Sequence, residues 1–78
     1  MGNGGSYNIG FEYITDTNAH TGRFCRLYAL ADAVISTATV QNASGNTFSS
    51  VPLNHGDEIE GVFTSVTLAS GKIIAYKI

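Results

Sequence analysis

Alternation between apolar and polar side chains is the feature that most constrains the fold of this 78-residue chain. In residues 7–14, the side chains of Tyr7, Ile9, Phe11 and Tyr13 would share one face, with Asn8, Gly10 and Glu12 on the other. A period of two residues is typical of a half-buried β-strand. The same stretch lacks the spacing of three to four residues that an amphipathic helix needs. The pattern therefore predicts a strand over residues 7–14.

Further strands are predicted between clusters of turn-forming residues. Asp16–Gly22, Asn42–Asn46, Asn54–Asp57 and Ala69–Lys72 are rich in Gly, Asn, Asp and Ser, which favour turns. The strand candidates between them are 23–30, 34–40, 47–51, 58–68 and 73–78. Pro52 lacks a backbone N–H, so its strand ends there or lies at a sheet edge. Residues 27–33 are rich in Leu and Ala, which leaves a helix open as an alternative for that stretch.

These elements predict an all-β fold, a small antiparallel β-sandwich or jelly-roll-like barrel. We assign residues 7–78 to a single domain, because no linker or change in composition divides them. Residues 1–6, which contain three glycines, are predicted to be a flexible N-terminal arm. Gly71 is expected to sit in a tight hairpin between the strands 58–68 and 73–78.

The small size of the chain predicts that an isolated monomer would be only marginally stable. A domain of this length buries only about 60% of its unfolded surface. Cys25 is the only cysteine, which excludes an intrachain disulfide, and only 13% of the residues are charged, against about 25% in an average soluble domain. Oligomerisation is the remaining source of stability, and we predict a homo-oligomer.

Several function classes receive no support from the residues. The net charge of −2 argues against nucleic-acid binding. No apolar stretch approaches the roughly 20 residues of a membrane-spanning helix. We predict no cofactor and no metal site, because His20 and His55 are far apart in the sequence and the acids Asp57, Glu58 and Glu60 lack the spacing of a calcium loop.

No catalytic residue is predicted either. His55 precedes Gly56 and Asp57 and could act as a general base, but no serine lies in a nucleophile-elbow pattern. Cys25 stands between Arg23 and Arg26, an environment that could activate a thiol. Strand alternation places Cys25 on the face of Leu27 and Ala29, where we expect a small apolar core residue. We therefore predict that the chain is not an enzyme.

The longest strand candidate, residues 58–68, is apolar on both faces. Strict alternation puts Ile59, Gly61 and Phe63 on one face and Glu60, Val62, Val66 and Leu68 on the other. One face would fill the domain core, and the other would contact another subunit. The candidate interface residues are therefore Val62, Phe63 and Val66 on this strand, Arg23 and Arg26 as charged partners, and Gly2, Asn3, Gly4 and Gly5 as an arm lying over a neighbour.

Residues 53–77, together with 21–24 and 33–35, resemble short proteins encoded among the structural genes of tailed phages. The resemblance rests on a turn glycine at Gly56, the strand Ile59–Thr64 and the Ser70-Gly71 turn before a last apolar strand. It implies a bacteriophage virion protein made in the host cytoplasm, a capsid decoration or cement protein, commonly a homotrimer, bound to the major capsid protein on the capsid surface. A head-fibre or tail adhesin module and a cupin-like small-molecule-binding domain are the alternatives.

Overall fold

The computed structural model describes residues 9–78, and within that range the chain forms six β-strands and no helix. The predicted arm at residues 1–6, including Gly2, Asn3, Gly4 and Gly5, lies outside the described residues. The strands are β1 (Gly10–Ile14), β2 (His20–Ala29), β3 (Ala33–Val40), β4 (Ser49–Leu53), β5 (Glu58–Ser70) and β6 (Ile73–Lys77). The predicted all-β fold is confirmed. The helical alternative for residues 27–33 is wrong, because β2 continues to Ala29 and β3 begins at Ala33.

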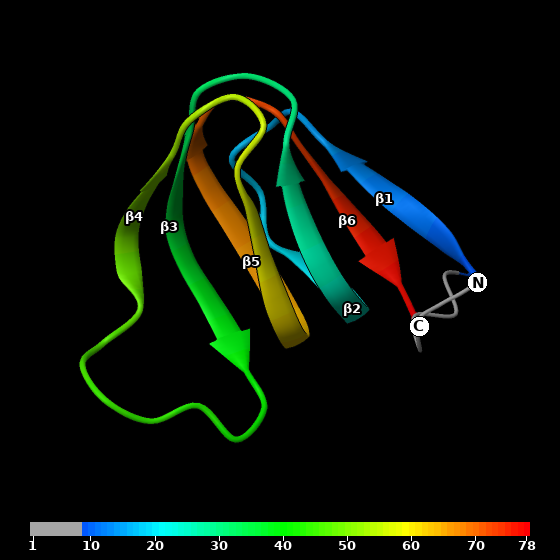
Figure 1. The fold of residues 1–78 in the computed structure, drawn as a ribbon, viewed down its shortest axis with the longest axis vertical. Helices are drawn as coiled ribbons and strands as arrows, with labels where there is room; N and C mark the ends of the chain where they lie inside the picture. The colour runs from blue at the N-terminus through cyan, green and yellow to red at the C-terminus, as the bar shows by residue number, and fades with distance from the viewer. Residues whose placement is uncertain (1–8) are drawn as a thin grey trace.

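All six strands belong to one antiparallel sheet with the order β1-β6-β2-β5-β3-β4 (Figure 1). The predicted hairpin between the last two strands is wrong, because β2 lies between β5 and β6. β2 pairs with β5 through Leu27 and Ile59, and with β6 through Leu27 and Ala75. The two-residue link at Gly71 and Lys72 is short but does not join neighbouring strands.

The sheet folds over on itself because its two longest strands bend. A straight strand of 13 residues, the length of β5, would span about 43 Å. The described part of the chain measures only 32 Å along its longest axis. β5 therefore turns back at its middle, and β2 bends beside it (Figure 1). The early part of β5 pairs with β2 and the later part pairs with β3, which produces two packed layers from a single sheet.

β-Bulges mark these bends and change which side chains face inward. The β2–β5 register shifts on both sides of the Phe24–Phe63 pair, and the β3–β5 register shifts beside the Val40–Phe63 pair. A bulge adds one residue to a strand and reverses the alternation beyond it. Phe63, Val66 and Leu68 are consequently all buried on one face. The predicted separation of Phe63 from Val66 and Leu68 is wrong for this reason.

The same correction applies to β2. The predicted alternation grouped Phe24 with Arg26 and placed Cys25 with Leu27. In the structure Phe24, Leu27 and Ala29 are buried together, whereas Cys25 and Arg26 are half-buried. The register between β2 and β6 shifts between Phe24 and Arg26, which accounts for the change of face. Cys25 is therefore outside the fully buried core.

The space between the two layers holds a single apolar core. Its buried side chains come from all six strands: Ile14, Phe24, Leu27, Ala29, Ala33, Ile35, Leu53, Phe63, Val66, Leu68, Ile73 and Ala75. None of the buried residues in the described range is polar or charged. The rings of Phe24 and Phe63 belong to directly paired residues at the bends. They occupy the place where the two layers meet.

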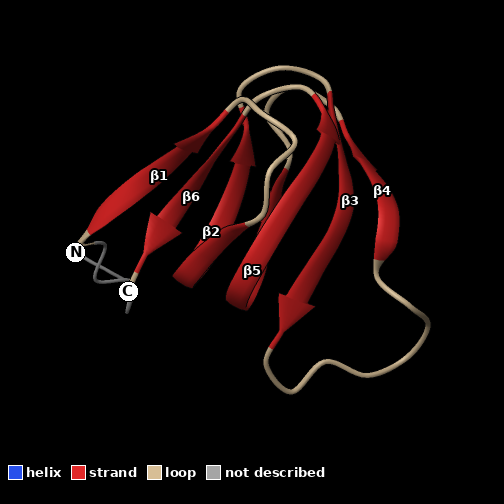
Figure 2. Cartoon of the chain, turned by 180° about the vertical axis from the view of Figure 1, so that it is seen from behind, coloured by secondary structure: helices blue, strands red, loops and turns tan. Residues whose placement is uncertain are grey.

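The connections lie at two ends of this folded sheet. The loop between β3 and β4 extends from one end, and the other connections gather at the opposite end (Figure 2). There, the backbone N–H of His55 donates to Asp32 Oδ1 at 2.9 Å, and the N–H of Leu30 donates to the Lys72 carbonyl at 3.0 Å. Gly71 has a φ of +89° and passes against the Asp32 carbonyl and Ala33. A side chain at position 71 would overlap this backbone.

Replacing Gly71 with alanine should destabilise the fold more than the same change at Gly56. Both glycines have a left-handed φ, +89° and +93°, so each alanine carries a strain of about 1–3 kcal/mol. A Cβ at Gly56 meets no atom within 4 Å, whereas one at Gly71 collides with the 32–33 backbone. Denaturant unfolding of the two variants measures the difference. Equal losses of stability would show that the approach at Gly71 is not close.

Phe63→Ala should lower the free energy of unfolding by about 3–5 kcal/mol, because the ring is 1% exposed in the core. Phe11→Ala removes the same atoms from a ring that is 57% exposed, and it should cost much less. Urea titration of both variants compares them directly. A loss below about 1 kcal/mol for Phe63→Ala would contradict its place between the layers.

Candidate functional site

Two groups of side chains stand out on the surface of the described residues. The first is a charged cluster around His20 at the start of β2. The ring nitrogen Nδ1 lies 2.8 Å from Glu12 Oε2, and Nε2 lies 2.7 Å from Asp16 Oδ1. Lys77 Nζ lies 3.7 Å from Glu12 Oε1. The cluster joins β1, the β1–β2 loop, β2 and β6.

The charges in this cluster stabilise one another. The hydrogen bond to Glu12, followed by the one to Asp16, raises the pKa of His20 above its usual 6.5. The hydrogen bond from His20 lowers the pKa of Glu12, with a further contribution from Lys77, and it lowers the pKa of Asp16 as well. With a carboxylate at each ring nitrogen, the imidazole favours its doubly protonated, charged form.

The second group is the outer side of the layer formed by β1, β6 and β2. Two rows of paired residues cross it: Phe11–Tyr76–Arg26 and Tyr13–Ile74–Tyr28. We call these six residues the aromatic face. The Phe11 and Tyr76 rings meet edge to face with 6.4 Å between centroids, and the Arg26 guanidinium lies 5.7 Å from the Tyr76 centroid. Glu60 and Glu58 on β5 continue the two rows.

The aromatic face is the unusual surface of this protein. Ile9, Phe11 and Tyr13 are 75%, 57% and 56% exposed, although large apolar side chains normally fill the core. The alternation in residues 7–14 correctly groups these side chains on one face. In the structure that face points to solvent, and Ile14 alone fixes β1 into the core. These exposed apolar side chains make the aromatic face a candidate binding surface.

Arg26, a predicted interface residue, lies at the β2 end of the aromatic face. Its Nε is 3.5 Å from Glu58 Oε1 and 3.6 Å from Glu60 Oε2, distances too long for good hydrogen bonds. The Nε atom is covered by protein and makes no hydrogen bond. The side chain is therefore held by charge attraction and by the Tyr76 ring. The strands thus bring Arg26 together with aromatic partners that the sequence reasoning did not assign to the interface.

The other predicted interface residues lie elsewhere. Arg23 is exposed on β2, and Val62 is half-buried on β5. Phe63 and Val66 are core residues of the chain itself, so their side chains have no surface to offer a partner. The bulges in β5 explain this placement, since they turn both residues to the inner side. The alternation of residues 9, 11 and 13 was the signal in the sequence that could have located the aromatic face.

The residues considered for chemistry take structural positions. Asp57 Oδ2 accepts the Asn54 N–H at 2.8 Å and thereby closes the turn before β5. His55 is exposed in that turn. In residues 9–78 no group of three His, Cys, Asp or Glu residues is arranged to hold a metal ion. Around His20, the two carboxylates lie at opposite ring nitrogens and do not converge on one point.

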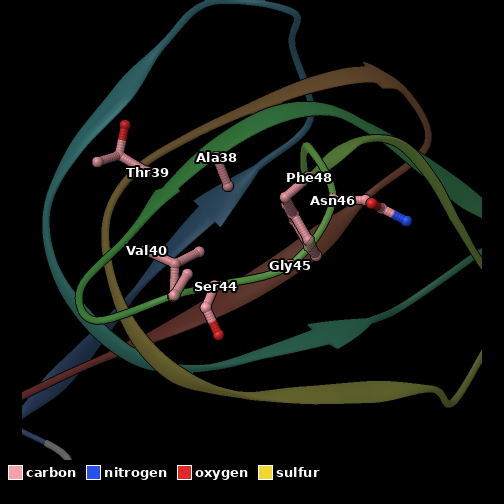
Figure 3. A pocket seen from close by; sticks show the side chains of 8 residues that line it. Ala38, Thr39, Val40, Ser44, Gly45, Asn46 and Phe48 are labelled. Atoms are coloured by element: carbon pink, nitrogen blue, oxygen red, sulfur yellow. The ribbon is translucent and has the colours of Figure 1, made fainter.

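A hollow of about 310 Å³ lies where β3 runs into the following loop (Figure 3). Hydroxyl, amide and apolar groups line it without any charged side chain: Ala38, Thr39, Val40, Ala43, Ser44, Gly45, Asn46 and Phe48. Such a lining can accommodate a small neutral group. It contains no acid, base or nucleophile–base pair with which to carry out a reaction.

Comparison with known proteins identifies no relative. No protein-family model, no curated protein and no solved structure matches the chain. Within residues 9–78, no helix of the length and apolar character required to cross a membrane is present.

Because of the charged cluster, the free energy of unfolding should fall both when the pH is lowered and when it is raised. The contribution of His20 is complete below pH 6.5 and is lost as the pH rises through its raised folded-state pKa. The contributions of Glu12 and Asp16 are complete above their usual pKa values of 4.5 and 3.8 and are lost on acidification. Unfolding free energy should therefore be highest between roughly pH 5 and 6.5.

His20→Gln removes the titrating ring and should abolish the decline of stability above pH 6.5. His55→Gln, at the exposed turn histidine, is the matched control and should retain that decline. Chemical denaturation over a pH series measures both variants. A wild-type slope that persists unchanged in His20→Gln would contradict the assignment.

Proposed function

We propose that this chain is a structural subunit that acts by binding other protein subunits, and that it decorates the capsid of a tailed phage. The observation that carries the binding role is the aromatic face. Four aromatic rings, an isoleucine and an arginine are paired across three strands there, instead of the small polar residues that solvent-facing strands usually carry. Aromatic residues and arginine are the types enriched in protein interfaces.

The composition of the whole chain supports the same role. Charged residues form 13% of the sequence, so much of the surface is uncharged. A folded sheet with a single small core gains stability when its outer apolar face is covered. The capsid as partner is the more specific part of the proposal and follows from the sequence resemblance to phage structural proteins. In this proposal the protein lies on the outside of the virion, bound to the major capsid protein.

Co-sedimentation tests this function. The purified chain is mixed with capsids assembled from the major capsid protein of the same genome, and bound protein is quantified after pelleting. Saturable binding is expected. Ile74→Lys places a charge in the middle of the aromatic face and should weaken binding by about tenfold or more, the loss typical of an interface hot spot.

Thr37→Lys, on an exposed position of β3, adds the same charge to the other layer and serves as the control. It should bind like the wild type, and circular dichroism establishes that both variants are folded. Absence of binding by the wild type would contradict the capsid assignment. Equal binding by the two lysine variants would show that the aromatic face is not the docking surface.

A further inference from the structure

We propose that the free edge of β1 pairs antiparallel with β1 of a second copy, joining two folded sheets into one across a twofold axis. The contact is made mainly by the backbone at the edge of the sheet, and it leaves the β6 and β2 part of the aromatic face open. This inference goes beyond the proposed function, because the partner is a second copy of the chain and does not depend on binding to a capsid. The argument rests on the difference between the two sheet edges and on the residue order in β1.

The β4 edge has features that disfavour the addition of another strand. Pro52 has no N–H to donate, and Ser50 has a φ of +51°, which breaks the regular extended backbone. Proline and backbone irregularities are the usual means by which proteins protect a sheet edge. β4 pairs only with β3, and Ser50 and Pro52 interrupt the regular backbone of this short edge strand. A second strand would find no continuous ladder there.

The β1 edge carries fewer of these protections, since its one positive φ, +149°, is at Gly10, the first residue of the strand. β1 pairs only with β6, and within residues 9–78 no other strand is hydrogen-bonded to it. It contains no proline and no lysine. Its one charged residue, Glu12, is held by His20 and Lys77 within the same chain. That charge is therefore neutralised instead of repelling an incoming strand. An exposed, apolar and less protected edge is a site for strand addition.

The residue order of β1 favours a second copy as the added strand. Antiparallel pairing centred on Phe11 sets Phe11 opposite Phe11, and Ile9 opposite Tyr13 in both directions. Apolar side chains thus meet on the outer side, where cross-strand aromatic and aliphatic pairs stabilise a sheet. On the inner side Gly10 lies opposite Glu12, so the two Glu12 carboxylates do not face each other. Centring the pair on Glu12 would set these like charges directly opposite, which is destabilising.

The resulting dimer has an isologous interface, in which the same surface is used by both copies. Its outer side unites the two aromatic faces into one continuous surface. The contact is twofold, so it differs from the threefold arrangement that the resemblance to phage proteins implies. The β4 edges remain at the two ends of the enlarged sheet, where their irregular backbone prevents further growth.

Light scattering coupled to size exclusion tests the pairing. At micromolar concentration the chain should have a mass of about 16 kDa, twice its 8.2 kDa. Phe11→Lys brings two lysines together at the twofold axis and should raise the dissociation constant by about tenfold or more. Ser49→Lys adds a lysine to the β4 edge and should leave the dimer intact. Circular dichroism establishes the fold of each variant.

Disulfide cross-linking tests the register in a Cys25→Ala background. Phe11→Cys should oxidise to a covalent dimer, because directly opposed residues have Cα atoms about 4.5–5.5 Å apart, within reach of a disulfide. Tyr13→Cys should not link to itself, whereas a mixture of Ile9→Cys and Tyr13→Cys should form the mixed dimer.

A wild-type monomer, or a dimer or trimer indifferent to Phe11→Lys, would overturn this inference. A monomer that binds capsids would refute the edge pairing and leave the proposed function standing. A dimer that forms the predicted cross-links but fails to bind capsids would refute the proposed capsid binding and support the edge pairing.

Discussion

The bends of β2 and β5 at the Phe24–Phe63 pair are the constraint on which the rest of the structure depends. A flat sheet of six short strands would have one apolar side and nothing to cover it. Bending the two longest strands folds the sheet so that this side covers itself. Both rings then lie fully between the layers. Each bulge interrupts the regular strand pairing at a few positions, and the bend that it produces allows the core to form.

Folding the sheet also determines which surfaces remain. Since the inner side forms the core, contacts with other molecules can involve only the outer side, the edges and the loops. The outer side of the β1-β6-β2 layer carries the aromatic face, and β1 is the edge without proline, its one positive φ being at its first residue, Gly10. His20 fixes this edge to β2 through Glu12 while neutralising its charge. The same arrangement therefore stabilises β1 and leaves its edge available for the pairing that we propose.

Local patterns predicted the strands well because they depend on neighbouring residues. The turn at Asn54–Asp57 and the strand Ala33–Val40 follow from turn chemistry and β-branched side chains. Pro52 also indicated an edge strand correctly. The strand order could not be predicted in this way: the turn at Gly71 looked like a hairpin, yet β2 lies between the strands it connects. Inserting β2 there depends on contacts between residues far apart in the sequence.

The candidate site was harder to predict than the strands. A single bulge reverses the alternation, and it moved Phe63 and Val66 from a predicted interface into the core. Arg26 was predicted to take part in contacts, but its aromatic neighbours on β6 and β1 depend on the strand order. Ile9, Phe11 and Tyr13 form a recognisable stripe in the sequence. Alternation alone does not predict whether such a stripe faces the core. The direction in which the sheet bends decides which face of the edge strand is buried.

Long-range nuclear Overhauser contacts in solution test the folded-over sheet most directly. The structure predicts that backbone protons of Leu27 show cross-strand contacts both to Ile59 and to Ala75, because β2 lies between β5 and β6. Val34 should in addition contact Ser70 at the far end of the bent β5. Direct ladder contacts between β5 and β6, with none from Leu27 to Ala75, would instead show a simple hairpin and contradict the fold.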